Sequence, residues 1–351
     1  MANFVYELAN RLKQCITVKL VGVSYAHMVL VGDNVPRGSI ASQLPEFTGE
    51  VVQLSNGYEY VDSFASFIGL GSFGVVFKGY SAKHQTDVAI KKMSKQNVKD
   101  NELRVIRSLN NAYLVGVLDI CELDEVTCCL VMELCDGDLE NHIRHHSNDG
   151  RLNSANLRVL IDNIARGYKG LFDLKIVHRD IKPQNILIKY VSKSKQLSAA
   201  KITDFGIART LDSEGADLCN VAGTLFYMAP EVGANLLKTC QYDSKVDMWS
   251  IGCLLYQCVT GEIPFDECFL CKLFLYTAGA NYDAYDPPEL PETTNEEIGD
   301  MIHSLLEIDS SRRCTPVQFY DKATSAPITP DIDDERSIYT SPTPVSRSLK
   351  A

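Results

Sequence analysis

Short apolar runs separated by polar turns fill the first half of the chain, and longer helical patterns fill the second half. Three runs, 75–77, 88–90 and 130–132, have the length and the apolar content of buried strands. After about residue 155, apolar side chains recur at helical spacing over 157–168 and 246–259. A strand-rich part followed by a helix-rich part predicts an α+β fold with two lobes.

The two ends of the chain differ from this central part. Residues 1–60 begin with apolar positions at helical spacing, continue through a β-branched stretch over 17–31, and end in a passage containing Gly, Pro and Ser. This extension contains no motif, and its role stays open. Residues 321–351 carry Ser-Pro and Thr-Pro pairs among Asp and Ser with few apolar residues, which predicts a disordered tail.

Composition narrows the function classes. Lys and Arg number 34 against 45 Asp and Glu, so the net charge is −11, which argues against a protein that mainly neutralises nucleic-acid phosphates. The start of the chain lacks the pattern of a signal peptide, and Lys19 and His27 interrupt the most apolar stretch, 16–32, so we expect an intracellular protein without a membrane span. The 12 cysteines are scattered, and Cys268 and Cys271 form a single CxxC, which favours reduced thiols over a structural metal.

A glycine pattern, GxGxxGxV, occupies residues 69–76. Glycine lets the backbone approach phosphate oxygens and adopt dihedral angles that other residues avoid. A dinucleotide-binding site uses a similar pattern but needs a helix directly after the glycines, whereas residues 75–78 continue as a strand. The pattern therefore predicts a phosphate-binding hairpin. Lys91 closes a later strand, and Glu102, which begins a helical pattern, could hold its ammonium; without these neighbours Lys91 would be an edge-strand lysine in solvent.

Three further motifs follow in order along the chain. They are HRDIKPQN at 178–185, DFG at 204–206 and APE at 229–231. Together with the glycine pattern, they resemble a eukaryotic protein kinase domain from about residue 64 to residue 320. Lys182, within the first of these motifs, indicates the serine/threonine type. Several motifs in the same order are far more specific than any one of them.

The resemblance implies a two-lobed protein kinase-like fold over 61–320. A small β-rich lobe would cover about 61–135, and a larger helical lobe about 136–320. ATP and Mg²⁺ are the implied cofactors, and the implied partners are protein substrates. The sequence indicates neither the substrate nor the oligomeric state.

The resemblance also assigns chemical roles to individual residues. Asp180 would accept or orient the proton of the substrate hydroxyl, and Lys182 would reach the γ-phosphate. Asn185 and Asp204 would hold Mg²⁺, a hard cation that prefers oxygen ligands. Lys91 would bind the α- and β-phosphates. Such chemistry depends on position and charge neutralisation more than on covalent steps.

The same resemblance outlines an ATP pocket, although each of its apolar residues could equally be plain core. Glu102 would orient the phosphate-binding lysine, Met132 would limit access to the back of the pocket, and Asp138 would lie near the ribose. Backbone groups of Glu133 and Cys135 would bond to the adenine. The phosphate loop and the apolar walls would be formed by Gly69, Gly71, Gly74, Ile68, Val76, Ala89 and Leu187.

Scaffold roles follow for residues of the large lobe. Asp247 would brace the catalytic loop through backbone N–H groups, and Glu231 would form a largely buried ion pair with Arg313. Thr224 would contact the catalytic aspartate and lysine. The segment between 185 and 204 is longer than usual and basic, which predicts an extended surface hairpin.

The loop before the APE motif departs from the family pattern. In the family that the chain resembles, an arginine at the position of Arg179 commonly meets a phosphorylated side chain on this loop. The usual position of that side chain falls at about Cys219 or Asn220, and neither can be phosphorylated. We therefore hypothesise that activity does not depend on a phosphate at that position. The candidate substitutes for its charge are Asp212, Glu214 and Asp217, and the candidate phosphosites are Thr210 and Ser213.

Two other functions stay open. A pseudokinase, which keeps the fold as a scaffold or binding module without turnover, typically lacks the equivalents of Lys91, Asp180 or Asp204, and all three are present. A small-molecule phosphotransferase could share the fold, but the APE motif and the helical pattern through Arg313 favour a platform for protein substrates.

Overall fold

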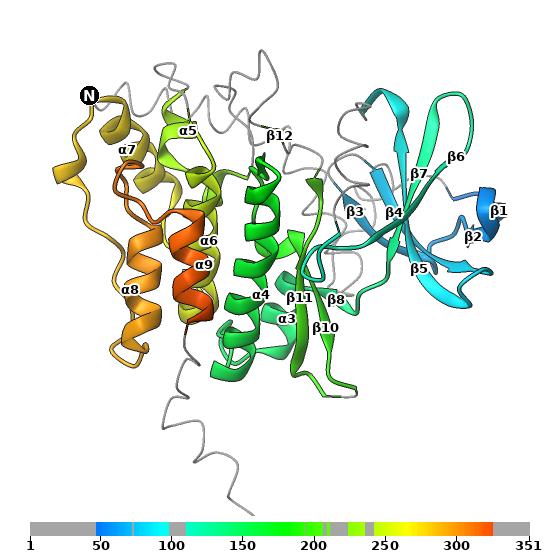
Figure 1. Cartoon of the computed structure of the whole chain (residues 1–351), viewed down its shortest axis with the longest axis horizontal. Helices are drawn as coiled ribbons and strands as arrows, with labels where there is room; N and C mark the ends of the chain where they lie inside the picture. Colours follow the sequence, from blue (N-terminus) through cyan, green and yellow to red (C-terminus); the bar gives the residue numbers. More distant parts are fainter. Residues whose placement is uncertain are drawn as a thin grey trace, which may run out of the picture.

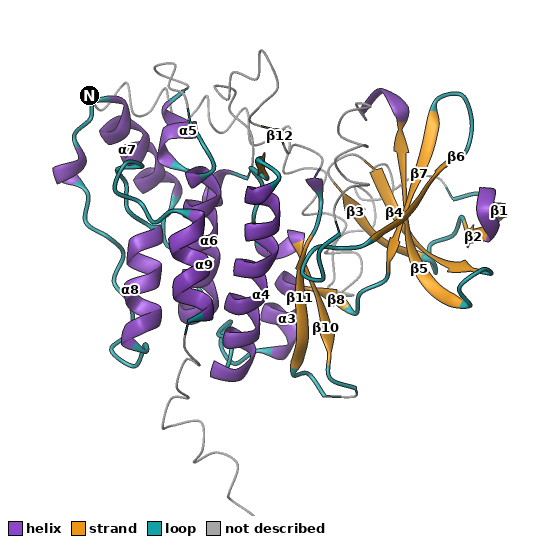
Figure 2. Ribbon diagram, viewed as in Figure 1, coloured by secondary structure: helices purple, strands orange, loops and turns teal. Residues whose placement is uncertain are grey.

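A strand-rich lobe and a helical lobe lie side by side, joined near residue 135 (Figures 1 and 2). The structure, a computed structural model, describes residues 47–71, 74–97, 110–192, 194–205, 209–210, 224–235 and 242–325. The two-lobed α+β fold predicted from the hydrophobic pattern is confirmed.

One antiparallel sheet forms the small lobe. Its strands among the described residues are β1 (Val51–Gln53), β2 (Tyr58–Val61), β3 (Phe67–Gly71), β4 (Gly74–Ser81), β5 (Thr86–Ser94), β6 (Val117–Glu122) and β7 (Thr127–Glu133), with 3₁₀ turns η1 (Ser55–Gly57) and η2 (Lys95–Asn97). The strand order is β1-β2-β4-β5-β7-β6, and β3 pairs with β4. Successive side chains of a strand point to opposite faces. Val88 and Ile90 of β5 therefore enter one apolar cluster with Phe77, while Ala89 enters a second cluster with Met132.

The sheet begins before the predicted boundary at residues 60/61, which falls inside β2. Tyr58 and Tyr60 are buried and alternate with the less buried Glu59 and Val61, and the Tyr60 ring stacks on Phe77 with centroids 4.8 Å apart. Asn56, at the turn that leads into β2, donates from Nδ2 to Asp119 Oδ2 at 2.6 Å and so ties the β1–β2 hairpin to β6. Residues 51–60 thus belong to the small lobe.

Helices make up most of the large lobe. They are α3 (Leu139–His146), α4 (Ser154–Asp173), α5 (Pro230–Ala234), α6 (Lys245–Thr260), α7 (Glu267–Ala278), α8 (Glu296–Leu305) and α9 (Pro316–Thr324), with 3₁₀ turns η3 (Pro183–Asn185), η5 (Leu225–Tyr227) and η6 (Tyr282–Ala284). The predicted helices at 157–168 and 246–259 lie within α4 and α6. The predicted domain end at residue 320 falls inside α9. None of the helices in the described ranges is long and apolar enough to cross a membrane.

Two small sheets connect these helices to the site. β8 (Gly137–Asp138), β10 (Ile186–Tyr190) and β11 (Leu197–Ile202) pair in the order β11-β10-β8, and β9 (Ile176–Val177) pairs with β12 (Arg209–Thr210). The hairpin predicted between residues 185 and 204 is therefore present as β10–β11. It stands beside α3 and α4 on the side of the large lobe that faces the small lobe (Figure 1).

Candidate active site

Three polar side chains form a closed ring at the end of β9. Lys182 Nζ lies 2.8 Å from Asp180 Oδ2 and 2.7 Å from Thr224 Oγ1, and Thr224 Oγ1 donates to Asp180 Oδ1 at 2.8 Å. Asp180 is buried. A buried carboxylate needs partners for its charge, and the ring provides an ammonium and a hydroxyl. The contact implied for Thr224 is thus present, although this residue comes 42 positions after Lys182.

Asn185 completes this group. The buried side chain donates from Nδ2 to the Asp180 backbone O at 2.8 Å and to Asp180 Oδ2 at 3.0 Å. It lies at the end of η3, where Pro183 occupies the first helical position. Because both contacts use the amide nitrogen, the amide oxygen is the atom that can ligate a hard cation.

A buried carboxylate braces the loop that carries Asp180. Asp247 accepts hydrogen bonds at 2.7 Å from the backbone N of His178, the backbone N of Arg179 and the hydroxyl of Tyr168. Burial raises the pKa of Asp247, and these donors act in the opposite direction. Arg179 has φ 68°, a left-handed conformation that costs a non-glycine residue about 1–2 kcal/mol. The bond to Asp247 holds the loop in that conformation.

The brace extends to the segment after β11 that carries Asp204. His178 Nε2 donates to Thr203 O at 2.9 Å, and its Nδ1 accepts from the Asp180 backbone N at 3.3 Å. The ring of His178 also packs edge-on against Phe205. One imidazole therefore fixes the loop at 178–180 and the segment at 203–205 relative to each other.

Lys91 and Asp204 join the two lobes. Lys91 Nζ, at the end of the apolar run in β5, lies 2.9 Å from Asp204 Oδ1, and the two side chains are 9% and 10% exposed. The edge-strand alternative for Lys91 is thereby excluded. Glu102, predicted to orient Lys91, lies outside the described residues.

The glycines of the predicted phosphate loop differ in what surrounds them. A Cβ on Gly71 would lie 2.8 Å from Cε and 2.9 Å from Nζ of Lys91, and a Cβ on Gly74 would lie 2.1 Å from the Lys92 backbone O. A Cβ on Gly69 would meet nothing within 4 Å. Gly71 therefore lies directly against the ammonium group, and β4 approaches β5 too closely at Gly74 for a side chain.

Most of the residues predicted as apolar walls gather in one cluster. Ala89 and Met132 are buried in it, and Val76 and Leu187 pack against it. Leu187 comes from β10 of the large lobe, so the cluster spans both lobes. Ile68 is 41% exposed, next to a register shift between Phe67 and Gly69.

The segment between the lobes carries the other predicted nucleotide contacts. Asp138 caps α3, because its carboxylate accepts from Asn141 N at 2.8 Å and from Asn141 Nδ2 at 2.7 Å. Burial first, and then the negative charge of Glu133, raises the pKa of Cys135 to about 11, so this thiol stays protonated at neutral pH. The Glu133 side chain contacts Lys189 and Lys201, two partners that sequence reasoning missed.

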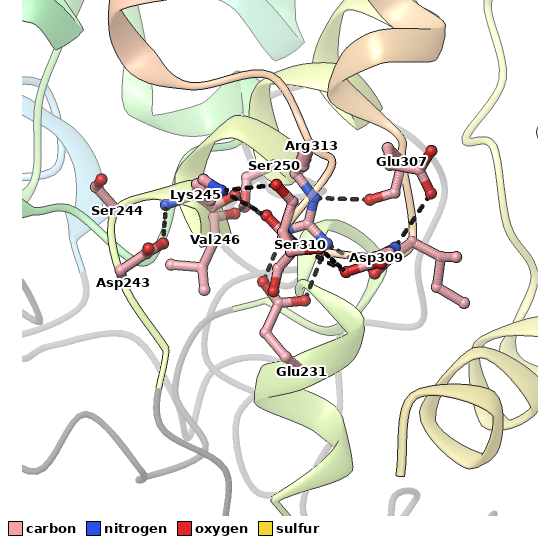
Figure 3. A network of polar contacts seen from close by, with 12 residues as sticks. Glu231, Asp243, Ser244, Lys245, Val246, Ser250, Glu307, Asp309, Ser310 and Arg313 are labelled. Carbon is pink, nitrogen blue, oxygen red and sulfur yellow. Dashed lines mark hydrogen bonds and ion pairs between the residues drawn. The ribbon is translucent and has the colours of Figure 1, made fainter. Parts of the chain in front are cut away.

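The predicted ion pair between Glu231 and Arg313 is present and buried. Figure 3 shows Glu231 reaching Arg313 from α5, with Lys245 and Glu307 on either side. Arg313 makes a bidentate pair with Glu231, at 2.6 Å and 3.0 Å, and donates to the backbone O of Glu307 and of Lys245. Its guanidinium also lies 5.1 Å from the centre of the Trp249 ring. Because the guanidinium donates to oxygens on several sides, its charge is well compensated.

The predicted charge partners of Arg179, which are Asp212, Glu214 and Asp217, lie outside the described residues. The same is true of the candidate phosphosite Ser213 and of Cys219 and Asn220, where the phosphorylated residue usually lies. For Thr210 the structure describes the backbone, which pairs with Ile176. Arg179 Nη1 donates to the Tyr242 hydroxyl at 3.3 Å.

Comparison with known proteins gives matches over most of the described chain. The protein kinase domain family matches residues 63–323. Serine/threonine-protein kinase unc-51 of Caenorhabditis elegans is 32% identical over 281 residues, which are 76% of this chain and 31% of that protein. Human serine/threonine-protein kinase ULK1 is 33% identical over 268 residues, 72% of this chain and 24% of that protein. The chain therefore spans about a quarter to a third of the length of these relatives.

Proposed function

This chain belongs to the protein kinase family, and from that premise we propose that it transfers the γ-phosphoryl group of ATP to serine and threonine hydroxyls of protein substrates. The observation that carries the proposal is the ring of Asp180, Lys182 and Thr224 beside Asn185. These contacts hold the Asp180 carboxylate in one orientation, as a group that orients a substrate hydroxyl requires.

The residues present fit ATP and Mg²⁺. Asn185 offers an amide oxygen, and Asp204 a carboxylate, both of the oxygen type that Mg²⁺ prefers. Gly71 leaves room against Lys91 that any larger residue would fill, as a loop over phosphate groups requires. Bound Mg²⁺ would supply charge neutralisation for the phosphates.

Side chains of the protein would perform the remaining steps of phosphoryl transfer. Asp180 would orient the substrate hydroxyl and take up its proton, with Thr224 and Asn185 fixing the carboxylate. Lys182 would place its positive charge where negative charge develops on the transferred group. Lys91 would bind the α- and β-phosphates. Preorganised charges of this kind lower the barrier because they need not reorient during the reaction.

The test is transfer of radiolabelled phosphate from ATP to casein or to the protein itself. We expect the wild type to transfer phosphate and Asp180→Asn to lose about 10²–10⁴-fold in kcat, because the general base is removed. Asn keeps the size of Asp180 but not its charge, so thermal unfolding of the variant checks that lost activity does not come from lost folding. If neither the wild type nor the variant transferred phosphate to any of several substrates, the pseudokinase alternative would be favoured.

A further inference from the structure

The carboxylate of Glu133 sits where the chain leaves the small lobe. Glu133 ends β7, and its backbone N donates to Gly116 O at 2.9 Å. Its side chain turns to the large lobe: Oε1 accepts from Lys201 Nζ at 2.6 Å, and Oε2 accepts from Lys189 Nζ at 2.7 Å. Oε1 also accepts from Gly116 N at 2.8 Å. One side chain thus links the end of β7, the loop before β6 and the β10–β11 hairpin.

The two lysines come from the face of the hairpin that carries Leu187. Lys201 pairs directly with Leu187 across the two strands, and Lys189 lies two residues after Leu187 on β10. Residues at this spacing share one face of a sheet. Leu187 packs in the same cluster as Met132 and Ala89. Any shift of the hairpin relative to β7 therefore also moves Leu187 within the predicted apolar wall of the ATP pocket.

The charges of this cluster are partly shielded from water. The side chains of Glu133, Lys201 and Lys189 are 19%, 14% and 37% exposed. Burial alone would raise the pKa of Glu133, but hydrogen bonds from Lys189, Lys201 and the Gly116 backbone lower it overall, so the carboxylate stays ionised at neutral pH. Without this negative charge, two ammonium groups would face each other across a short distance and repel.

Asp136, three residues after Glu133, attaches the chain to β10 a second time. Asp136 N donates to Ile188 O at 3.0 Å, and Asp136 Oδ2 accepts from Tyr190 N at 2.8 Å, so the chain is part of the β10 sheet from this point. Residues 134–135 therefore lie between two attachments to β10, the contact of Glu133 with Lys189 and the hydrogen bonds of Asp136.

We propose that Glu133, paired with Lys189 and Lys201, is a positioning residue that holds the backbone of 133–135 in place for the nucleotide and thereby tightens ATP binding. The proposal rests on the proposed function, because it assigns this backbone to ATP. It predicts an effect on nucleotide binding that is separate from the phosphoryl-transfer step, since the Glu133 side chain contacts Lys189, Lys201 and Gly116 and not the Asp180 ring.

The experiment compares Glu133→Gln and Lys201→Met with the wild-type chain. We expect the KM for ATP and the Kd for ATP, measured by isothermal titration calorimetry, to rise about 3- to 10-fold in both variants, while kcat stays within about twofold. The conservative variant Lys201→Arg keeps a positive charge opposite Glu133 and should keep the wild-type Kd for ATP. The matched control is Lys78→Met, which removes the exposed Lys78–Asp87 pair of the small lobe and should leave the Kd unchanged.

The outcomes distinguish the positioning role of Glu133 from the proposed function. Variants that bind ATP as tightly as the wild type, or an equal loss of binding in Lys78→Met, would overturn the positioning role and leave the proposed function standing. A rise in kcat with unchanged KM would also overturn it, because the cluster would then restrain turnover and not position ATP. A wild type that binds ATP but transfers no phosphate would refute the proposed function alone, and one that binds no ATP would refute both. Thermal unfolding of every variant checks that the fold is intact.

Discussion

The two lobes supply their parts of the site in different ways. In the large lobe, Asp180 contacts Lys182, Asn185 and Thr224, and the backbone of its loop is held by Asp247, all within the same lobe. In the small lobe, Lys91 reaches out on a long flexible side chain and meets Asp204 across the lobe boundary. The large-lobe geometry is therefore built into one folding unit, whereas the small-lobe geometry depends on how the lobes meet.

The largest expected effect is on the stability of the large lobe. Arg313→Met leaves the Glu231 carboxylate buried without its partner, and we expect a loss of about 3–5 kcal/mol in the free energy of unfolding. Arg312→Met is the matched control, because Arg312 is largely exposed and its pair with Glu307 is worth at most about 1 kcal/mol. Urea denaturation followed by circular dichroism measures both. Equal losses would mean that the large lobe does not depend on its buried network.

A smaller effect tests the small lobe. In Gly71→Ala the new Cβ displaces the Lys91 ammonium, and we expect kcat/KM for ATP to fall about 10- to 100-fold while the unfolding temperature changes little. Gly69→Ala, where a Cβ meets nothing within 4 Å, should cost distinctly less. Steady-state kinetics with varied ATP gives both values. If kcat/KM fell equally in the two variants, displacement of Lys91 would not be the cause of the fall.

The smallest expected effect concerns phosphate on the loop before the APE motif. We expect the purified protein to keep more than about half of its activity after phosphatase treatment, because Cys219 and Asn220 cannot carry a phosphate there. Mass spectrometry confirms removal of phosphate, and heat-inactivated phosphatase is the control. Loss of most of the activity would show that Arg179 depends on a phosphorylated partner after all.

Much of the large-lobe site could be predicted because its residues are close together in sequence. Asp180, Lys182 and Asn185 fall within six positions, and their spacing on a loop and a 3₁₀ turn brings them to one place. Thr224 and Asp247 are distant in sequence, and only the family resemblance indicated them. The contribution of Tyr168 to the brace was missed, since a buried tyrosine in an apolar helix looks like core.

The small-lobe predictions were weaker for physical reasons. The role of Glu133 depends on lysines from another lobe, and a lysine in an alternating strand reads as a solvent-facing residue. The pairing of Tyr58 and Tyr60 with β4 was missed because β1 and β2 are very short, and three or four residues give little periodicity to detect. The assignment of Glu102 stays a prediction.

Trp249 has a consequence for how the two lobes can be followed separately. It is the single tryptophan of the chain, lies fully buried in α6 and stacks on Phe265 beneath the Arg313 guanidinium. Intrinsic fluorescence excited at the indole band therefore reports on the interior of the large lobe alone. Thermal unfolding can be followed by Trp249 fluorescence and by the circular-dichroism signal of the β-strands. If the small lobe unfolded first, the second method would give the lower transition temperature.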